Sequence, residues 1–333
     1  MDLTTNYLGL RLAHPLIVGA SPIACDLALV ERAVESGAAA IVMHSLFEEQ
    51  WLGEQRARER FHDVHAEAHA EASRYLPRPD DFRQEPDEYL EHLRRIRRAV
   101  HVPVIASLNG TSSGTWLSFA RSLQEAGASA LELNLYDLTT DEKISSEVVE
   151  RRAMHLVRSV RQSVDIPVAV KLSPFYTALP HFASELVRVG ADGFVLFNRF
   201  YQADIEVEAL AVQRTLRLSD PSELLLRLRW LAVLSGRIDA SLSCSGGVHE
   251  PVDVVKAIMA GAHSVQLVST LLQHGPERIG VLLAGLREWM EQHDYDSLDQ
   301  MRGSMNLRRC PNPHAFERAN YVHVLQSWNF ERT

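Results

Sequence analysis

Short apolar runs alternate with stretches of helical periodicity along almost the whole chain. The apolar runs are rich in β-branched residues, and several of the stretches that follow them show apolar residues at helical spacing and end at a glycine. The pattern predicts eight strands, at residues 15–19, 40–44, 102–108, 130–135, 168–172, 193–198, 240–244 and 264–268. It predicts helices over residues 27–36, 115–126, 146–163 and 179–189.

This alternation predicts an α/β fold. Near-continuous apolar strands that alternate with helices are typical of a parallel sheet covered by helices. Eight strand–helix units are the number that closes a (β/α)8 TIM barrel, which typically needs about 250 residues. An open, doubly wound sheet is the competing fold, and it is disfavoured because no G-x-G-x-x-G motif follows the first strand.

The chain is longer than such a barrel requires. We expect the surplus in two insertions, at about residues 45–86 and 199–220, and in a C-terminal extension over about residues 292–333. Because both insertions follow strands, they should lie on the C-terminal face, where the active sites of these barrels are built. No linker rich in Pro, Gly or Ser divides the chain, so a single domain over residues 1–333 is predicted.

Composition narrows the classes of function. The chain is 46% hydrophobic and 23% charged, as soluble folded proteins are. A net charge of -9 disfavours nucleic acid as the partner. Neither a membrane span nor a secretory signal is recognisable, so a cytoplasmic protein is expected. Three isolated cysteines, Cys25, Cys244 and Cys310, fit a reducing compartment and form neither a disulfide framework nor a metal site.

Glycines and hydroxyl residues follow the last two predicted strands, as Ser245-Gly246-Gly247 and Ser269-Thr270. Glycines let backbone N–H groups approach a ligand closely, and a helix N-terminus behind them favours an anion. Loops seven and eight of such barrels often hold a phosphate. The alternative is a tight strand-to-helix turn, and the hydroxyls in loop eight make us favour a phosphate site.

Lysine is scarce in this chain, with only Lys143, Lys171 and Lys256. Lys171 ends the fifth predicted strand, where an unpaired ammonium would cost several kcal/mol to bury. It could meet an anionic cofactor ring or a substrate carboxylate, or form a Schiff base. The alternative is a structural ion pair with a carboxylate on a neighbouring strand, such as Glu132.

Three amides, Asn109, Asn134 and Asn198, also end predicted strands. Amides offer donors and acceptors without charge, which suits a flat heterocycle with alternating C=O and N–H edges. A single amide of this kind is usually a loop cap, but three at the mouth of one barrel favour a ligand. The series His62, His65 and His69 lies in a segment full of Arg and Glu and is interpreted as a solvated helix face, so no metal site is assigned.

In this order, the residues resemble the FMN-binding barrel of the dihydroorotate dehydrogenases over about residues 3–300. The strings that carry the resemblance are Ala20-Ser21, Glu132-Leu133-Asn134-Leu135, Val170-Lys171-Leu172, Asn198, Ser245-Gly246-Gly247-Val248 and Gln266-Leu267-Val268-Ser269-Thr270. A bacterial branch of dihydroorotate dehydrogenase-like proteins is more similar still, through residues 106–110, 197–201 and 316–321.

The resemblance implies FMN as the cofactor. Lys171 would face the N1/O2 edge of the flavin, while Gly246, Gly247, Ser269 and Thr270 would hold its phosphate. The remaining implied flavin and substrate contacts are Ala20, Ser21, Asn109, Asn134 and Asn198. It also implies a small-molecule substrate, a separate electron acceptor and a homodimer as in relatives, with pyrimidine biosynthesis as a candidate setting.

Several positions depart from the family pattern. The family's Asn-Leu-Ser-Cys-Pro-Asn, whose Cys is the catalytic base of the cytosolic class, here places Asp137 at the base position. His44 replaces the family's Lys after the second strand, and Arg199 replaces a small hydroxyl residue beside Asn198. Asp137 and His44 are therefore the candidate bases, and Arg199 is a candidate for binding a substrate carboxylate.

The leading hypothesis is an FMN-dependent oxidoreductase in which a CH–CH donor delivers hydride to flavin N5. Dihydroorotate itself is in question as the donor, because the base Cys is absent. Two alternatives stay open: an FMN-binding protein without turnover, and a Schiff-base aldolase that uses Lys171.

Overall fold

The computed structural model describes residues 1–47, 86–109, 113–135, 139–199, 204–213 and 217–327. Eight parallel strands close into a barrel in chain order, and the last pairs with the first through Val265 and Leu16. This confirms the predicted (β/α)8 TIM barrel. The strands are β3 (Leu16–Val18), β4 (Ile41–Phe47), β5 (Val104–Asn109), β6 (Ala130–Asn134), β7 (Val168–Leu172), β8 (Gly193–Leu196), β11 (Ser241–Ser245) and β12 (Ser264–Leu267).

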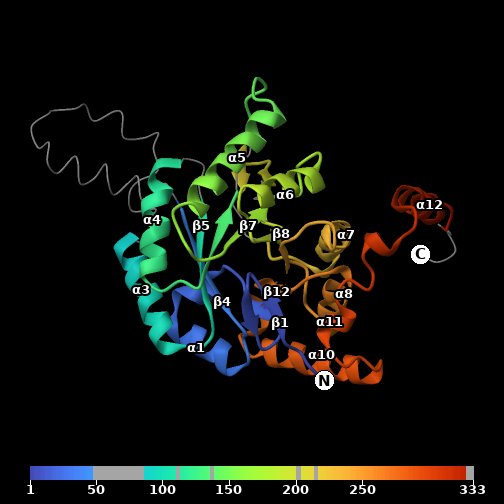
Figure 1. The fold of residues 1–333 in the computed structure, drawn as a ribbon, viewed down its shortest axis with the longest axis horizontal. Coiled ribbons are helices and arrows are strands. Elements are labelled where there is room, and N and C mark those ends of the chain that lie inside the picture. The colour runs from blue at the N-terminus through green and yellow to red at the C-terminus, as the bar shows by residue number, and fades with distance from the viewer. Residues whose placement is uncertain (48–85, 110–112, 136–138, 200–203, 214–216, 328–333) are drawn as a thin grey trace, which may run out of the picture.

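Helices surround the barrel (Figure 1). Each of the four helices predicted from the periodicity is present, with ends within two residues of the expected ones. The helices around the strands are α1 (Leu27–Glu35), α3 (Pro86–Ala99), α4 (Ser113–Glu125), α5 (Ser146–Arg161), α6 (Leu179–Arg188), α7 (Leu224–Leu234), α8 (Pro251–Ala260), α9 (Ser269–His274) and α10 (Arg278–Gln292).

Helix α5 shows how the chain specifies these elements. The side chain of Ser145 accepts a hydrogen bond from the backbone N–H of Val148, which caps the start of the helix. The residues that it buries, Ala153, Leu156, Val157 and Val160, recur at the spacing of one helical face. Arg158 and Arg161 lie in the last turn, where positive charge is favourable to the helix dipole. One apolar face therefore packs on the barrel while the charged face meets water.

A short antiparallel hairpin closes the N-terminal end of the barrel. It consists of β1 (Thr5–Tyr7) and β2 (Leu10–Leu12), and it buries Tyr7, Leu8 and Leu12 almost completely. These side chains pack on the first inward-facing residues of the strands, which are Ile17, Val42, Ile105, Ala130, Ala169 and Val195. The hairpin was not among the predicted elements.

The barrel interior changes character along the strands. Two residues beyond the apolar layer, the inward positions of β5, β6 and β7 are Ser107, Glu132 and Lys171, and Gln266 on β12 joins them. All four side chains are buried. Burying this much polarity is tolerable only if the groups pair with each other or with a ligand. The C-terminal half of the interior is therefore the part of the barrel suited to chemistry.

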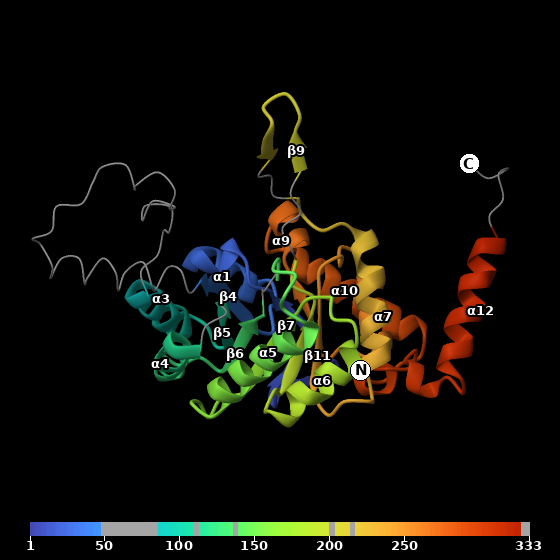
Figure 2. The same ribbon diagram turned by 90° about the horizontal axis from the view of Figure 1, so that it is seen from above.

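The second predicted insertion contains a hairpin of β9 (Asp204–Glu206) and β10 (Ala211–Gln213), which stands clear of the barrel (Figure 2). Its side chains Ile205, Val207 and Leu210 are exposed. Of the first predicted insertion, residues 48–85 lie outside the described part of the chain.

The segment after α10 forms the short α11 (Leu298–Met301) and then α12 (Pro313–Gln326), which projects from the barrel (Figure 2). Before α11, the chain pairs with the N-terminus through a bridge between Asp2 and Ser297. Within the described residues, none of the helices combines the length and the apolarity that crossing a membrane requires.

Two histidines at the N-terminal end of the barrel predict an acid-sensitive fold. Burial lowers the pKa of His14 and of His263 to about 4, and the Nδ1 atom of each accepts a backbone N–H, from Leu16 and Leu242. Since both pKa values fall below the ordinary 6.5, protonation favours the unfolded chain. The stability from these groups is complete above about pH 6.5 and is lost as the pH falls toward 4.

We expect the free energy of unfolding to fall by up to about 1.4 kcal/mol per pH unit for each of the two histidines in that window. Denaturant unfolding at a series of pH values measures this slope. H14N and H263N, which keep an acceptor for the backbone N–H, should each flatten it. The exposed His101 is the matched control, and H101N should leave the slope unchanged. A slope that neither buried-site variant alters would contradict the assignment.

Candidate active site at the carboxyl ends of the strands

A buried ion pair occupies the centre of the barrel interior. The Lys171 Nζ atom lies 3.2 Å from Glu132 Oε1 and 3.5 Å from Gln266 Oε1. Gln266 Nε2 donates to the other Glu132 oxygen at 2.6 Å. Lys171 is 6% exposed and Glu132 1%, so the pair is shielded from water. Lys171 thus points into the barrel, as the flavin hypothesis requires, and also makes the ion pair with Glu132 that the sequence offered as the alternative.

Asn134 lies in a polar cluster on the neighbouring strands. Its Nδ2 atom is 2.9 Å from both Ser45 Oγ and Ser107 Oγ, and it is 3.2 Å from the carbonyl oxygen of Leu108. The two serine hydroxyls are themselves hydrogen-bonded at 2.8 Å. Three oxygen atoms therefore surround the amide nitrogen. Ser45 and Ser107 were not singled out from the sequence, because an isolated serine in a strand belongs to no recognisable motif. Asn109 ends β5 and is 9% exposed.

Two hydroxyls at the mouth lack hydrogen-bond partners among the described residues. Ser21 Oγ and Thr270 Oγ1 are both buried. Ser21 comes directly after β3 and Ala20, and Thr270 is in the first turn of α9 after β12. A buried hydroxyl without a partner costs free energy, so a polar group placed against either atom would be stabilising.

The glycine loop after β11 packs tightly on the start of α7. Gly246 and Gly247 have φ values of 97° and 79°, a region that other residues rarely adopt. A Cβ atom on Gly247 would lie 2.4 Å from the backbone nitrogen of Leu224. Side chains are thus excluded at both positions.

Ser219 links this loop to the start of α9. Its hydroxyl donates to Ser269 Oγ at 2.8 Å and accepts from the backbone N–H of Gly247 at 3.2 Å. Its own N–H also donates to Ser269 Oγ, at 2.9 Å. Loops seven and eight, which the sequence joined into one phosphate site, are therefore connected through a residue that the sequence analysis did not single out.

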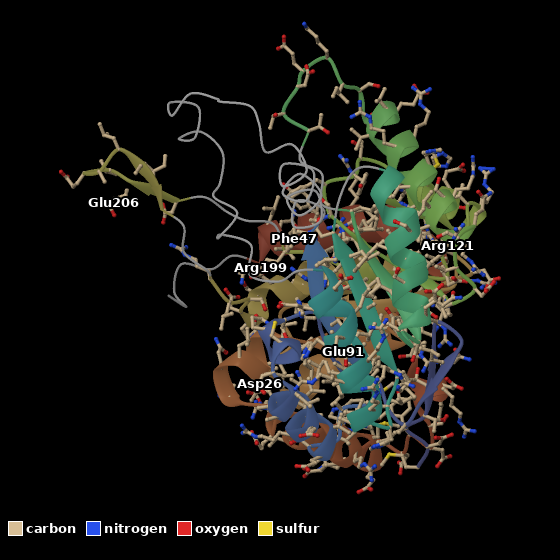
Figure 3. The ribbon with its side chains drawn as sticks, turned by 90° about the vertical axis from the view of Figure 1, so that its left-hand side faces the viewer. Asp26, Phe47, Glu91, Arg121, Arg199 and Glu206 are labelled. Atoms are coloured by element: carbon tan, nitrogen blue, oxygen red, sulfur yellow. The ribbon has the colours of Figure 1, made fainter. Side chains whose placement is uncertain are left out.

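Arg199 lies on the side of the molecule from which the β9–β10 hairpin projects (Figure 3). Its Nη2 atom is 3.3 Å from Glu223 Oε1, and about one third of its side chain is exposed. The preceding residue, Asn198, is half-buried, and its backbone N–H donates to the carbonyl of Leu172 at 2.8 Å. Arg199 and Asn198 thus follow β8 at the same mouth as Lys171.

His44 lies at an irregularity of β4. The pairing with β5 advances three residues on β4, from Val42 to Ser45, but only two on β5. This extra residue is a β-bulge, which redirects side chains locally. The His44 ring lies edge-on to Tyr89 with centroids 4.8 Å apart, and 6.4 Å from His92, so it meets two rings of α3.

Several sequence-based candidates lie outside the described residues, namely Asp137 and the series His62, His65 and His69. Within the part of the chain that the structure describes, no group of three or more His, Cys, Asp or Glu side chains could hold a metal ion.

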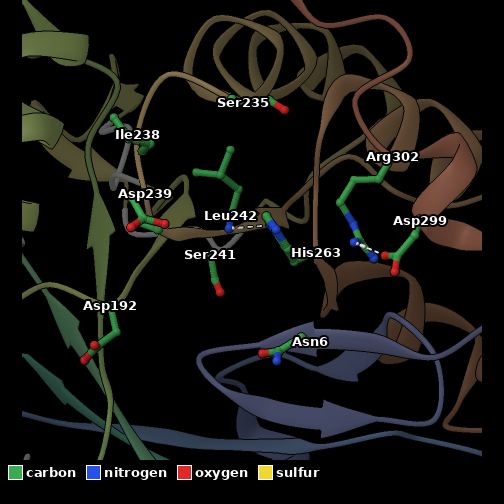
Figure 4. Close-up of a pocket in the computed structure, with 12 residues that line it drawn as sticks. Asn6, Asp192, Ser235, Ile238, Asp239, Ser241, Leu242, His263, Asp299 and Arg302 are labelled. Atoms are coloured by element: carbon green, nitrogen blue, oxygen red, sulfur yellow. Dashed lines mark hydrogen bonds and ion pairs between the residues drawn. The ribbon is translucent and has the colours of Figure 1, made fainter.

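A separate hollow of about 710 Å³ lies at the opposite end of the barrel (Figure 4). Its lining includes Asp192, Ser241 and His263, which lie at the N-terminal ends of β8, β11 and β12. None of the candidate site residues lines it. The chemistry expected of such barrels belongs to the other face, where Lys171 and the glycine loop are found.

Comparison with known proteins decides the family. The profile of the family described as dihydroorotate dehydrogenase matches residues 83–290, which is more than half of the chain. The chain belongs to the dihydroorotate dehydrogenase family. The matched region contains six of the eight loops that follow the barrel strands, from the loop after β5 to the one after β12, together with Lys171 and Glu132.

The chain is similar to several proteins that are named as oxidoreductases. It is 24% identical to the catalytic subunit of dihydroorotate dehydrogenase B (NAD(+)) of Thermoplasma acidophilum over 91% of this chain and 98% of the relative. It is 26% identical to the protein of the same name from Petrotoga mobilis, over 65% of this chain and 73% of the relative. It is 22% identical to the NAD-dependent dihydropyrimidine dehydrogenase subunit PreA of Escherichia coli, over 93% and 78%.

Proposed function

We propose that this protein is an FMN-dependent oxidoreductase that removes a hydride and a proton from a CH–CH donor. The observation that carries the proposal is the meeting of three features at one mouth of the barrel. These are the buried ammonium of Lys171, the glycine loop at Gly246 and Gly247, and the buried hydroxyls of Ser21 and Thr270. A flavin mononucleotide has a polar ring edge and a phosphate, and these features are complementary to both.

The residues present fit FMN. Polar ligand atoms would satisfy the orphaned hydroxyls of Ser21 and Thr270, and glycine at positions 246 and 247 keeps side chains out of the loop after β11. The residues that would hold the cofactor are Ala20, Ser21, Asn109, Asn134, Lys171, Asn198, Gly246, Gly247, Ser269 and Thr270. FMN, when bound, supplies the hydride acceptor.

The chain's own residues supply charge, orientation and proton transfer. Lys171, held by Glu132 and Gln266, would place a fixed positive charge against the N1/O2 edge of the ring. Arg199 would bind a carboxylate of the substrate at the mouth. We assign the base that takes the substrate proton to Asp137, which follows β6, and keep His44 as the second candidate.

The ion pair argues against the aldolase alternative. A Schiff base forms through attack by a neutral amine on a carbonyl carbon. The Glu132 carboxylate, 3.2 Å from Lys171 Nζ, stabilises the charged ammonium instead. The geometry therefore favours a lysine that acts as a fixed cation.

The experiment that tests the proposal is the visible spectrum of the purified full-length protein. We expect an oxidised flavin band, with FMN identified in the extract by mass, that is bleached anaerobically by dithionite and by a CH–CH donor. Dihydrouracil, dihydrothymine and dihydroorotate form the first panel, and dihydroorotate should be the poorest because Asp137 stands in place of the family's Cys. A colourless protein that takes up no added FMN would refute the cofactor. Bleaching by dithionite alone, with no donor active, would indicate an FMN-binding protein without turnover.

A further inference from the structure

A buried arginine lies directly behind the glycine loop. Arg227 is on α7 and is 5% exposed, which is unusual for an arginine. Its Nε atom donates to the carbonyl oxygen of Ser245 at 2.9 Å, and its Nη1 atom donates to that of Glu223 at 2.7 Å. The position of a Cβ on Gly246 is 3.0 Å from Nη2 and 3.3 Å from Cζ. The guanidinium is thus packed against the backbone of the loop, where a side chain on residue 246 would displace it.

The charge of Arg227 is incompletely neutralised. Its Nη2 atom is 3.3 Å from Glu223 Oε2, but the other oxygen of that carboxylate is 3.3 Å from Arg199 Nη2. Two arginines therefore share one carboxylate. Asp220 also acts on Arg199, but it is exposed and its carboxylate accepts from the N–H and hydroxyl of Ser222, so water and this cap screen it.

Burial of this cation is costly. Desolvation is the main influence on the Arg227 pKa and lowers it from its ordinary value, while the Glu223 carboxylate acts in the opposite direction. Arg227 is desolvated and shares its counter-ion with Arg199, so an anion bound at the loop would stabilise its charge. Ser245, Gly246 and Gly247 separate Arg227 from that anion, so the interaction acts through the loop.

We propose that Arg227 is a positioning residue that supplies the positive charge behind the phosphate site and so makes this protein select FMN over riboflavin. The inference rests on the proposed function. Arg227 orders the loop through its bond to the Ser245 carbonyl and attracts the phosphate dianion electrostatically, without touching it. Riboflavin has the same ring and no phosphate, so it should be insensitive to this charge.

The test is titration of the deflavinated full-length protein with FMN and with riboflavin, followed by quenching of flavin fluorescence. In R227M, we expect the FMN Kd to rise about tenfold or more while the riboflavin Kd is unchanged. R227K, which keeps the charge but loses the fork of donors, should lie between wild type and R227M. R229M is the matched control, because Arg229 is on the same helix, is exposed and pairs with Glu317 away from the loop. Its two Kd values should match the wild type.

Equal weakening of FMN and riboflavin in R227M would overturn the inference, since Arg227 would then only support the fold. If R227M does not fold, the same two titrations with the E223Q variant test the inference. Removal of the shared carboxylate should raise the preference for FMN over riboflavin, and an unchanged preference would overturn the inference. A wild-type protein that binds neither flavin would refute the proposed function itself, which is a different outcome from binding FMN without any dependence on Arg227.

Discussion

Replacing Lys171 with methionine should lower the free energy of unfolding by about 3–5 kcal/mol. The substitution removes the ammonium and leaves the Glu132 carboxylate 1% exposed, with Gln266 as its remaining hydrogen-bond partner among the described residues. A buried charge without its counter-ion is among the most destabilising local defects in a protein. Urea unfolding followed by circular dichroism measures the loss. The same variant should also fail to be reduced by any CH–CH donor, because the fixed cation at the ring edge is gone.

The double variant K171M/E132Q separates the two effects. It removes both charges and keeps an oxygen that can accept from Gln266 Nε2, so most of the lost stability should return. Flavin reduction by a donor should not return. The exposed pair Arg32–Glu277 is the control, and R32M should leave the unfolding midpoint nearly unchanged. A K171M variant as stable as the wild type would contradict a buried ion pair between Lys171 and Glu132.

Gly247→Ala should abolish flavin binding and lower the free energy of unfolding by about 2–4 kcal/mol. Two costs add. The φ of 79° is strained for alanine, and the new Cβ would lie 2.4 Å from the backbone nitrogen and 2.9 Å from the Cα of Leu224. Because the obstacle is backbone, neither a rotamer change nor a flexible side chain can relieve it. The flavin content of the purified protein and its denaturant midpoint measure the two parts.

Gly9→Ala is the matched control for conformation without crowding. Gly9 has a φ of 73°, close to that of Gly247, but a Cβ there would have no atom within 4 Å. It should cost only the strain of a left-handed alanine, about 1–2 kcal/mol, and leave flavin content unchanged. If G247A behaved like G9A on both measures, the close packing of the loop on α7 would not matter for the ligand.

The strands were predictable because most of them are apolar on both faces. Residues 168–172 were predicted as a strand, and β7 has the same limits. The β1–β2 hairpin was not predicted, because each of its strands has three residues, too few for a period to be recognised. Its value to the fold comes from Tyr7 and Leu8 entering the barrel, a contact between distant parts of the chain.

The sequence predicted which candidate residues lie at the ends of strands, but not which contacts their side chains make. The sequence placed Lys171 and Glu132 near each other because their strands are neighbours, but it could not tell a cofactor-facing lysine from a paired one, and this lysine is inward-facing and paired. His44 illustrates a different difficulty. Counting residues to the end of the strand ignores a bulge, and the extra residue in β4 brings the ring to Tyr89.

Arg227 was invisible in the sequence for a third reason. An arginine usually lies at the surface, and the apolar sequence around Arg227 does not distinguish it from Arg229, which is exposed on the same helix. Its burial depends on the absence of a side chain at Gly246, which precedes α8 and not α7. A contact between two segments that are separate in the sequence, such as Arg227 and Gly246, can be recognised only in the three-dimensional structure.

The pairing of β12 with β3 has a consequence for how the protein is made in the cell. Val265 pairs with Leu16, so β3 receives its second neighbour only after the residues up to Val265 have left the ribosome, and the bridge between Asp2 and Ser297 forms later still. At synthesis rates of roughly 5–20 residues per second, that interval is on the order of tens of seconds. During it, the exposed edge of β3 and the apolar face of the N-terminal hairpin are available to other nascent chains. Productive translation of this protein should therefore depend on chaperones that cover an early segment until the ring closes.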